Sequence, residues 1–89
     1  MNLIENVHIK IQNRNANKKI TIVQGLDTGL NLKLIIKFWK KEFNCGGTII
    51  DDMKYGKIIQ LSGDQRQNVM NFLIDEKICD KNMIKNHGY

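Results

Sequence analysis

The sequence predicts an α/β fold, a two-layer sandwich in which two helices pack on one face of a four- to five-stranded, mainly antiparallel sheet. Short runs of alternating apolar and polar residues indicate half-buried strands, and two longer runs with apolar residues three and four positions apart indicate amphipathic helices. The runs follow one another in the order β-β-α-β-β-α-β. Strands joined by hairpins, and helices that are apolar on one face, favour two packed layers.

The first two strands are predicted at residues 7–14 and 20–24, where isoleucine and valine alternate with polar side chains. Between them, "NRNANKK" contains asparagines, which tolerate turn conformations. We therefore expect a β-hairpin with a basic tip. The two glycines of "GLDTG" then interrupt the chain before the next element.

The first helix is predicted at residues 31–43, with Asn31 as its N-cap. The glycines of "CGG" are expected to end it, because glycine commonly follows a helix C-terminus. Its apolar side chains share one face, which predicts burial in the core for all of them and no role in stacking on bases: Leu32, Ile35, Ile36, Trp39 and Phe43.

A second stripe on the first helix is basic, and it consists of Lys33, Lys37, Lys40 and Lys41. Eight basic and two acidic residues precede Glu42, whereas six basic and seven acidic residues lie from Glu42 onward. Such a dipolar chain suits a polyanion, most commonly nucleic acid, although a solvated helix face explains lysines equally well. Leu34 and Phe38 lie one helical turn apart beside this stripe, and we expect them to be partly exposed.

The second half contains a second hairpin, "GTIID" and "KIIQLS" around "DMKYG", and a second helix at residues 65–77. The final "MIKNHGY" is expected to close the sheet as a last strand. Asp64, followed three residues later by Gln67, has the spacing of a capping box at the start of the second helix. This interpretation leaves Gln65 and Arg66 as outward-facing side chains without a structural role.

Composition limits the classes of function. The 89 residues suit one domain, 1–89, with residues 1–6 as a short extension. No signal peptide or membrane-spanning run is evident, so a cytoplasmic protein with reduced Cys45 and Cys79 is expected. No nucleophile–base pair, phosphate-binding loop or metal-ligand spacing appears, and His8 and His87 lie at opposite ends of the sequence. We therefore predict a protein that is not an enzyme and needs no cofactor or metal.

Several segments in register resemble one known family. "HIKIQNRN", "ITIVQGL", "KKEFNCGGTI", "YGKIIQLSGDQRQNV" and the final "KNHGY" are similar to the eukaryotic translation initiation factor one family, also called the SUI family. The similarity extends from about residue 7 to residue 89, and "IQLSGDQR" is its most specific segment. The resemblance implies an α/β sandwich that binds the small ribosomal subunit near the peptidyl-tRNA site. It also implies that the protein holds the scanning complex open until a start codon pairs with initiator tRNA.

The resemblance further implies three surfaces on a monomeric protein that also meets other initiation factors. The start-site stringency surface comprises Asp64, Gln65, Arg66 and Gly88. The loop that faces initiator tRNA comprises Asp51, Asp52, Met53 and Lys54, and the carboxylates of its two aspartates would repel phosphate. The residues that contact ribosomal RNA are Arg14, Asn15, Asn17, Lys18 and Lys19 at the hairpin tip and Lys33, Lys37, Lys40 and Lys41 on the first helix.

This chain departs from the family pattern at two places. Ala16 and Asn17 stand where the family usually has glycine and arginine, and only "MNLIEN" precedes the first strand, where relatives usually carry a polar tail that recruits other factors. An alternative is a SUI-like RNA- or ribosome-binding module that acts in reinitiation or ribosome recycling. Fold alone does not separate these functions.

Overall fold

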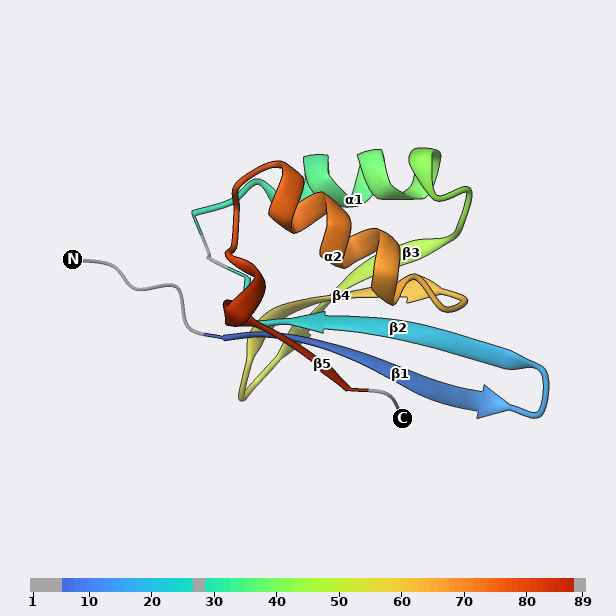
Figure 1. Cartoon of the computed structure of the whole chain (residues 1–89). Coiled ribbons are helices and arrows are strands. Elements are labelled where there is room, and N and C mark those ends of the chain that lie inside the picture. The colour runs from blue at the N-terminus through green and yellow to red at the C-terminus, as the bar shows by residue number, and fades with distance from the viewer. Residues whose placement is uncertain (1–5, 27–28, 88–89) are drawn as a thin grey trace.

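The computed structural model describes residues 6–26 and 29–87, and it confirms the predicted fold class and element order. Two helices cover one face of a five-stranded sheet, as Figure 1 shows. The strands lie in the order β3-β4-β2-β1-β5, and of the pairs among the described residues the β1–β5 pair alone is parallel. The elements are β1 (Val7–Asn15), β2 (Lys18–Gln24), α1 (Leu32–Glu42), β3 (Gly47–Asp52), β4 (Gly56–Ser62), α2 (Arg66–Asp75), a 3₁₀ turn (Lys81–Met83) and β5 (Ile84–His87).

The hydrophobic core lies between the helices and the sheet. Trp39 of α1 is fully buried, and it stacks on Phe43 and meets Phe72 of α2 edge-on, with ring centroids 6.0 and 5.5 Å apart. The sheet contributes alternate residues such as Val7 and Ile9, because successive side chains of a strand point to opposite faces. Phe43 packs against this core and is half-buried, so the prediction of burial is confirmed for the other four apolar residues of the face and only in part for Phe43.

The first hairpin is longer and tighter than the sequence predicted. Both strands continue beyond the predicted bounds until only Ala16 and Asn17 form the turn, in which the Asn17 N–H donates to the Asn15 side chain at 3.1 Å. The strand register shifts between Asn13 and Asn15, which leaves Arg14 as the extra residue of a β-bulge. A bulge redirects the side chain that it contains. The basic tip therefore extends the sheet and is not a loose loop (Figure 1).

The ends of α1 confirm one prediction and correct another. The Asn31 side chain accepts a hydrogen bond from the Leu34 N–H at 3.1 Å, as expected of an N-cap. At the other end, Asn44 has φ 52° and takes the left-handed position after the C-cap, so the prediction that glycine ends this helix is wrong. Asparagine tolerates that conformation better than most residues with a side chain. Within the described residues, neither helix is long and apolar enough to cross a membrane.

Gly25 and Gly56 both have positive φ angles, 91° and 75°, but they differ in the space around them. A Cβ at Gly25 would lie 2.5 Å from the Asn6 carbonyl oxygen, whereas one at Gly56 would meet nothing within 4 Å. Gly56→Ala should therefore cost only the left-handed strain of about 1–2 kcal/mol. Gly25→Ala should cost that strain and about 1–3 kcal/mol more for the overpacking. Urea unfolding of both variants tests this, and equal losses would contradict the close approach at Gly25.

Candidate nucleic-acid interface

The hairpin tip and the segment before α2 lie together at one end of the molecule. They line an open cavity of about 590 Å³ that is predominantly polar and basic. In Figure 1 the tip of β1–β2 and the start of α2 are both at the right of the view. The cavity brings all five predicted tip residues beside residues that precede the second helix; the lining is Arg14, Asn15, Asn17, Lys18, Lys19, Ile20, Gln60, Ser62 and Gly63.

Buried Thr21 fixes the segment of residues 63–66, which we call the joint. Its hydroxyl donates to the Gly63 carbonyl at 2.7 Å and accepts from the Gln65 N–H at 2.7 Å. The Gly63 N–H donates to the Lys19 carbonyl at 2.7 Å, so the joint is also tied to the basic hairpin. Sequence reasoning missed Thr21, and the signal was a polar side chain in a strand position that faces the core.

The capping box predicted at Asp64 is wrong. The N-cap of α2 is Gln65, whose side chain makes no capping bond, and the Gln67 side chain donates to Asn71 at 2.9 Å. Asp64 instead accepts two hydrogen bonds from the Arg66 guanidinium, at 2.8 and 2.7 Å, and one from the Arg66 N–H at 3.3 Å. This paired contact with Arg66, opposed only in part by burial, lowers the pKa of the Asp64 carboxyl.

Gln65 and Arg66 are half-buried and bonded, so the prediction that they face outward without a structural role is also wrong. The Gln65 side chain donates to the Ser62 carbonyl at 3.1 Å and accepts from Asn68 at 2.9 Å. The Arg66 guanidinium also donates to the His87 carbonyl at 3.3 Å. Gly88 lies outside the described residues, but the joint contacts the C-terminal strand at the residue before it.

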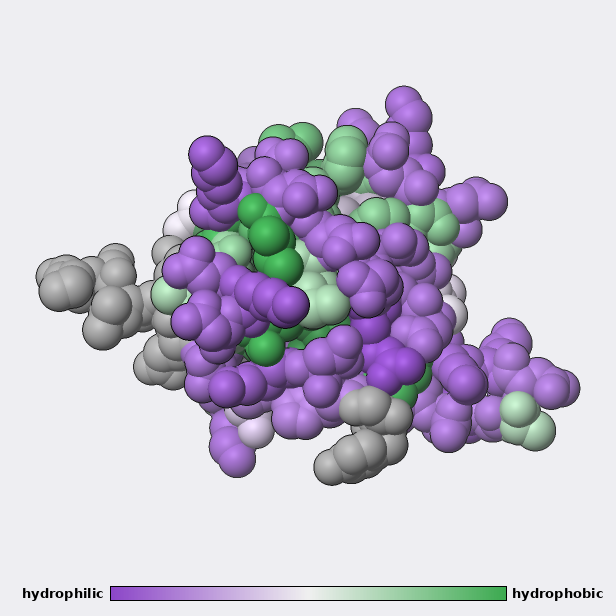
Figure 2. Space-filling model, viewed as in Figure 1, coloured by the Kyte–Doolittle hydropathy of each residue, from purple (hydrophilic) through white to green (hydrophobic). Residues whose placement is uncertain are grey.

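The lysine stripe of α1 is exposed, as predicted: Lys33, Lys37, Lys40 and Lys41 all face solvent. Among the described residues the ion pairs are Lys57–Asp51 and Arg66–Asp64, so the stripe has no acidic partner there. Leu34 and Phe38 are also exposed, at 63% and 46%, which confirms the expectation for this pair. Figure 2 shows apolar groups among hydrophilic ones along the helical layer at the top of the view.

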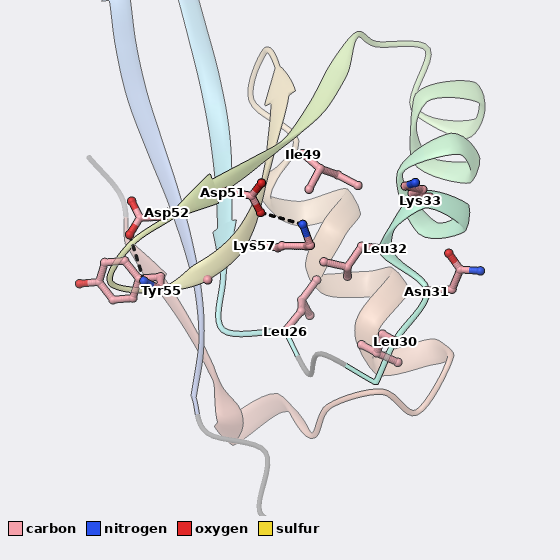
Figure 3. Close-up of a pocket in the computed structure, with 11 residues that line it drawn as sticks. Leu26, Leu30, Asn31, Leu32, Lys33, Ile49, Asp51, Asp52, Tyr55 and Lys57 are labelled. Carbon is pink, nitrogen blue, oxygen red and sulfur yellow. Dashed lines mark hydrogen bonds and ion pairs between the residues drawn. The ribbon is translucent and has the colours of Figure 1, made fainter.

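The β3–β4 loop carries the residues predicted to face initiator tRNA, but its carboxylates already have partners. Figure 3 shows Asp51 bound to Lys57 at 2.7 Å and Asp52 accepting from the Tyr55 N–H at 3.0 Å. Asp52 also accepts from the Lys54 N–H at 2.8 Å. These backbone bonds, that from Tyr55 first, lower the pKa of the Asp52 carboxyl. Asp51 is thus paired with a lysine, whereas the partners of Asp52 are neutral N–H groups that leave its negative charge in place. The expectation that these carboxylates repel phosphate stays a prediction.

The same loop also exposes two large side chains, Met53 and Tyr55. Sequence reasoning named Met53 as part of the loop and did not single out Tyr55. Met53 is fully exposed, and Tyr55, 43% exposed, has the ammonium groups of Lys10 and Lys54 within 5.8 and 5.2 Å of its ring centre. Figure 3 shows the adjacent cavity of about 590 Å³, whose apolar wall includes Leu26 and Ile49. Its rim carries two lysines and two aspartates, a balance that does not favour phosphate. The loop lies at the opposite end of the sheet from the hairpin tip (Figure 1).

The parallel β1–β5 pairing brings His8 and His87 into contact, although 79 positions separate them in the sequence. His8 Nδ1 lies 3.1 Å from His87 Nε2, and the rings stack with centroids 5.3 Å apart. The two histidines are thus far apart in the sequence but adjacent in the fold, which sequence reasoning did not predict. In the described part of the chain, no group of three or more His, Cys, Asp or Glu residues is arranged to hold a metal ion.

Burial raises the pKa of both thiols, Cys45 and Cys79, which makes them weaker nucleophiles.

Comparison with known proteins decides the family. The model of the family described as translation initiation factor SUI1 matches residues 4–79. The chain belongs to the SUI1 family. It is 49% identical over 83 residues to the protein translation factor SUI1 homolog of Oryza sativa subsp. indica, a match that spans 93% of this chain and 72% of that protein. It is 43% identical to mouse eukaryotic translation initiation factor 1, over 93% of this chain and 74% of the relative.

The SUI1 fold is also seen in a more distant solved structure. The C-terminal domain of human eIF2D superposes with a TM-score of 0.81 at 22% identity, over 93% of this chain and 43% of that one. At this identity the likeness concerns the fold alone. The SUI1 relatives therefore identify the chain as a translation initiation factor homologue, a non-enzymatic class of protein that acts in start-codon selection. Such a factor associates with the small ribosomal subunit and the initiation complex.

Proposed function

We propose that this chain binds the small ribosomal subunit near the peptidyl-tRNA site, promotes scanning, and leaves when initiator tRNA pairs correctly with the start codon. The observation that carries the proposal is the joining of the basic hairpin tip to the joint, within a chain 43–49% identical to SUI1 relatives. The hairpin tip can then bind ribosomal RNA while the joint responds to start-codon pairing. The protein works as a monomer in the cytoplasm, without a cofactor.

Ribosomal RNA is the partner of the tip and of the α1 lysines. Lysine and arginine bind phosphates largely without regard to sequence, and they release counterions as they do so. The tip presents Arg14, Lys18 and Lys19 around an open polar cavity, and none of them forms an ion pair with another described residue. The bulge at Arg14 redirects its side chain relative to the regular alternation of β1. Two basic patches on one body can thus hold two RNA segments.

The β3–β4 loop faces initiator tRNA and obstructs it by bulk. Lys57 offsets part of the Asp51 charge, while Asp52 stays anionic, so repulsion of phosphate adds to the effect of bulk. Met53 projects fully into solvent at the turn, beside half-exposed Tyr55. A tRNA that settles fully into its site would collide with these side chains. Full accommodation and continued binding of the factor then exclude one another.

Other initiation factors meet the exposed apolar pair on α1. Leu34 and Phe38 are large side chains that phosphate contacts do not use, and the Phe38 ring lies 5.4 Å from that of Phe72 on α2. Protein interfaces are enriched in aromatic anchors of this kind. This pair supplies a contact that is separate from the family's N-terminal tail.

Arg66→Glu is expected to raise initiation at near-cognate codons relative to AUG, because it replaces the cation of the joint with an anion and releases the factor early. The measurement is a pair of AUG and near-cognate reporters translated with each variant as the sole factor of this family. The same substitution breaks the Asp64 pair, so stability should fall by about 1 kcal/mol. That loss is larger than the change within about 0.5 kcal/mol that is usual for an unconstrained surface residue.

Asp64→Ala is the matched control, because it breaks the same ion pair but leaves the Arg66 cation in place. It should cost a similar free energy of unfolding, about 1 kcal/mol, and raise near-cognate initiation less than Arg66→Glu does. If the two variants altered the reporter ratio in proportion to their lost stability, the joint would be only a helix start and the proposed role would be wrong.

A further inference from the structure

We propose that His8 and His87 are positioning residues for the joint: their ring contact holds the His87 carbonyl against Arg66, and a second proton on the pair releases it. The inference rests on the proposed function, in which Arg66 takes part in start-codon selection. It assigns the two histidines a role that neither their spacing nor their separate positions in the sequence indicates.

A short chain of contacts connects the pair to the joint. His8 Nδ1 and His87 Nε2 are 3.1 Å apart, and the rings are nearly parallel at 18°. The His87 carbonyl accepts from Arg66 Nη1 at 3.3 Å, and the same guanidinium holds both Asp64 oxygens. Asp64, Arg66, His87 and His8 therefore form one continuous series from the joint to β1.

The ring contact matters for strand β5 because this strand is short and lies at the edge of the sheet. It has four residues, and among the described strands its one partner is β1, from Val7–Ile84 to Lys10–His87. His87 is the last residue of that ladder, and strand ends open most readily. The stacked imidazoles add a second attachment at the end of β5 that presents its carbonyl to Arg66. Losing the ring contact should loosen this end first.

The ring contact permits one added proton but not two. A neutral imidazole has one donor and one acceptor nitrogen, so the 3.1 Å contact needs an N–H on one ring and a lone pair on the other. With both rings protonated, two N–H groups and two positive charges would face each other. The pair would then separate, and the His87 backbone would no longer be held.

The second proton is the one on His8, because a positive charge on His87 is among the causes that lower the His8 pKa, and the surroundings oppose it. Burial lowers the pKa of His8 below its ordinary 6.5, and His87, Lys10 and Lys85 lower it further. Lys10 comes from β1 and Lys85 from β5, Arg66 of α2 binds the His87 carbonyl, and the β2 residue that faces His8 in register is the uncharged Gln24. No carboxylate acts on the His8 ring among the described groups.

The direction of the pH dependence follows from the sign of this shift. The folded chain binds the His8 proton less tightly than the unfolded chain does. The contribution of the neutral His8 ring to the stability of the fold is therefore fully present above pH 6.5. It is lost as pH falls from 6.5 through the lower pKa of the folded state. The Arg66–His87 contact should therefore weaken in mildly acid solution, where Asp64 is still ionised and still binds Arg66.

The test follows the Arg66 side-chain N–H signal of the ¹⁵N-labelled full-length chain by NMR between pH 7.5 and 5. In the wild type this signal should shift together with the titration of the His8 ring. In His8→Phe, which keeps an aromatic ring but cannot accept the proton, that shift should be absent. A wild-type signal that stays constant while His8 titrates, or that moves equally in His8→Phe, would overturn the inference.

A second measurement connects the pair to start-codon selection. His8→Phe and His87→Gln, both folded at pH 7.5 by circular dichroism, should raise the near-cognate reporter ratio in the same direction as Arg66→Glu and less strongly. If Arg66→Glu raised the ratio and both histidine variants left it unchanged, the positioning role would be wrong. If the NMR coupling held but Arg66→Glu itself were neutral, the proposed function would fail and not the coupling.

Discussion

Replacing Trp39 with alanine should lower the free energy of unfolding by about 3–5 kcal/mol, the usual loss for a buried large aromatic side chain. Trp39 is fully buried and packs on Phe43 and Phe72, so its removal leaves a cavity between the helices. Its indole N–H is buried without a partner among the described residues, which places the expected loss toward the lower end of the range. Small domains are stable by about 5–15 kcal/mol in total, so this change approaches unfolding.

Urea or guanidinium unfolding measures this loss, with Leu34→Ala as the matched control on the same helix. Leu34 is 63% exposed, and its truncation should change stability by no more than about 0.5 kcal/mol. A Trp39→Ala variant as stable as Leu34→Ala would mean that the indole is not part of the core. The indole would then be a candidate for stacking on RNA bases.

Reversing Lys37 and Lys40 to glutamate should strongly weaken binding to small ribosomal subunits. Each neutralised phosphate contributes roughly 0.7–0.9 to the slope of log affinity against log salt, so two lost contacts lower the magnitude of that slope by roughly 1.4–1.8. Six or more such contacts make affinity fall by about three orders of magnitude between 50 and 200 mM salt. The double variant should therefore bind weakly at low salt and show a shallower dependence.

The matched control reverses Lys77 and Lys81, which are exposed and lie outside α1, in the segment after α2. It changes the net charge of the protein by the same amount, so it separates a local contact from a general field effect. Equal losses of affinity in the two double variants would show that only net charge matters. A wild-type affinity that does not change with salt would contradict phosphate binding altogether.

The sequence predicts most of the secondary structure because local rules govern it. Alternation places the strands, helical spacing places the buried faces of both helices, and Asn31 caps α1 as its residue type suggests. The local rule fails at the joint, where Asp64 and Gln67 have capping-box spacing but bind other groups. The Thr21 hydroxyl, more than forty positions away in the sequence, accepts a hydrogen bond from the N–H of Gln65, the N-cap residue of α2. A tertiary contact has replaced a local one, and spacing alone does not predict it.

The candidate site shows the same limit. Sequence reasoning names Asp64, Arg66 and the tip residues, but it does not bring His87 to Arg66 or to His8. That placement depends on a parallel strand pair between the two ends of the chain, and no short-range pattern specifies such a pair. The opposing charges in the β3–β4 loop were likewise visible in the sequence, whereas their pairing was not.

Release of this factor from the small subunit in response to correct start-codon pairing is the central proposal. The most direct measurement is the dwell time of the fluorescently labelled chain on single small-subunit complexes that carry initiator tRNA and an mRNA with either AUG or a near-cognate codon. We expect a short dwell at AUG and a clearly longer one at the near-cognate codon, with Arg66→Glu shortening the latter. Equal dwell times at both codons, or a longer dwell at AUG, would contradict release on correct pairing.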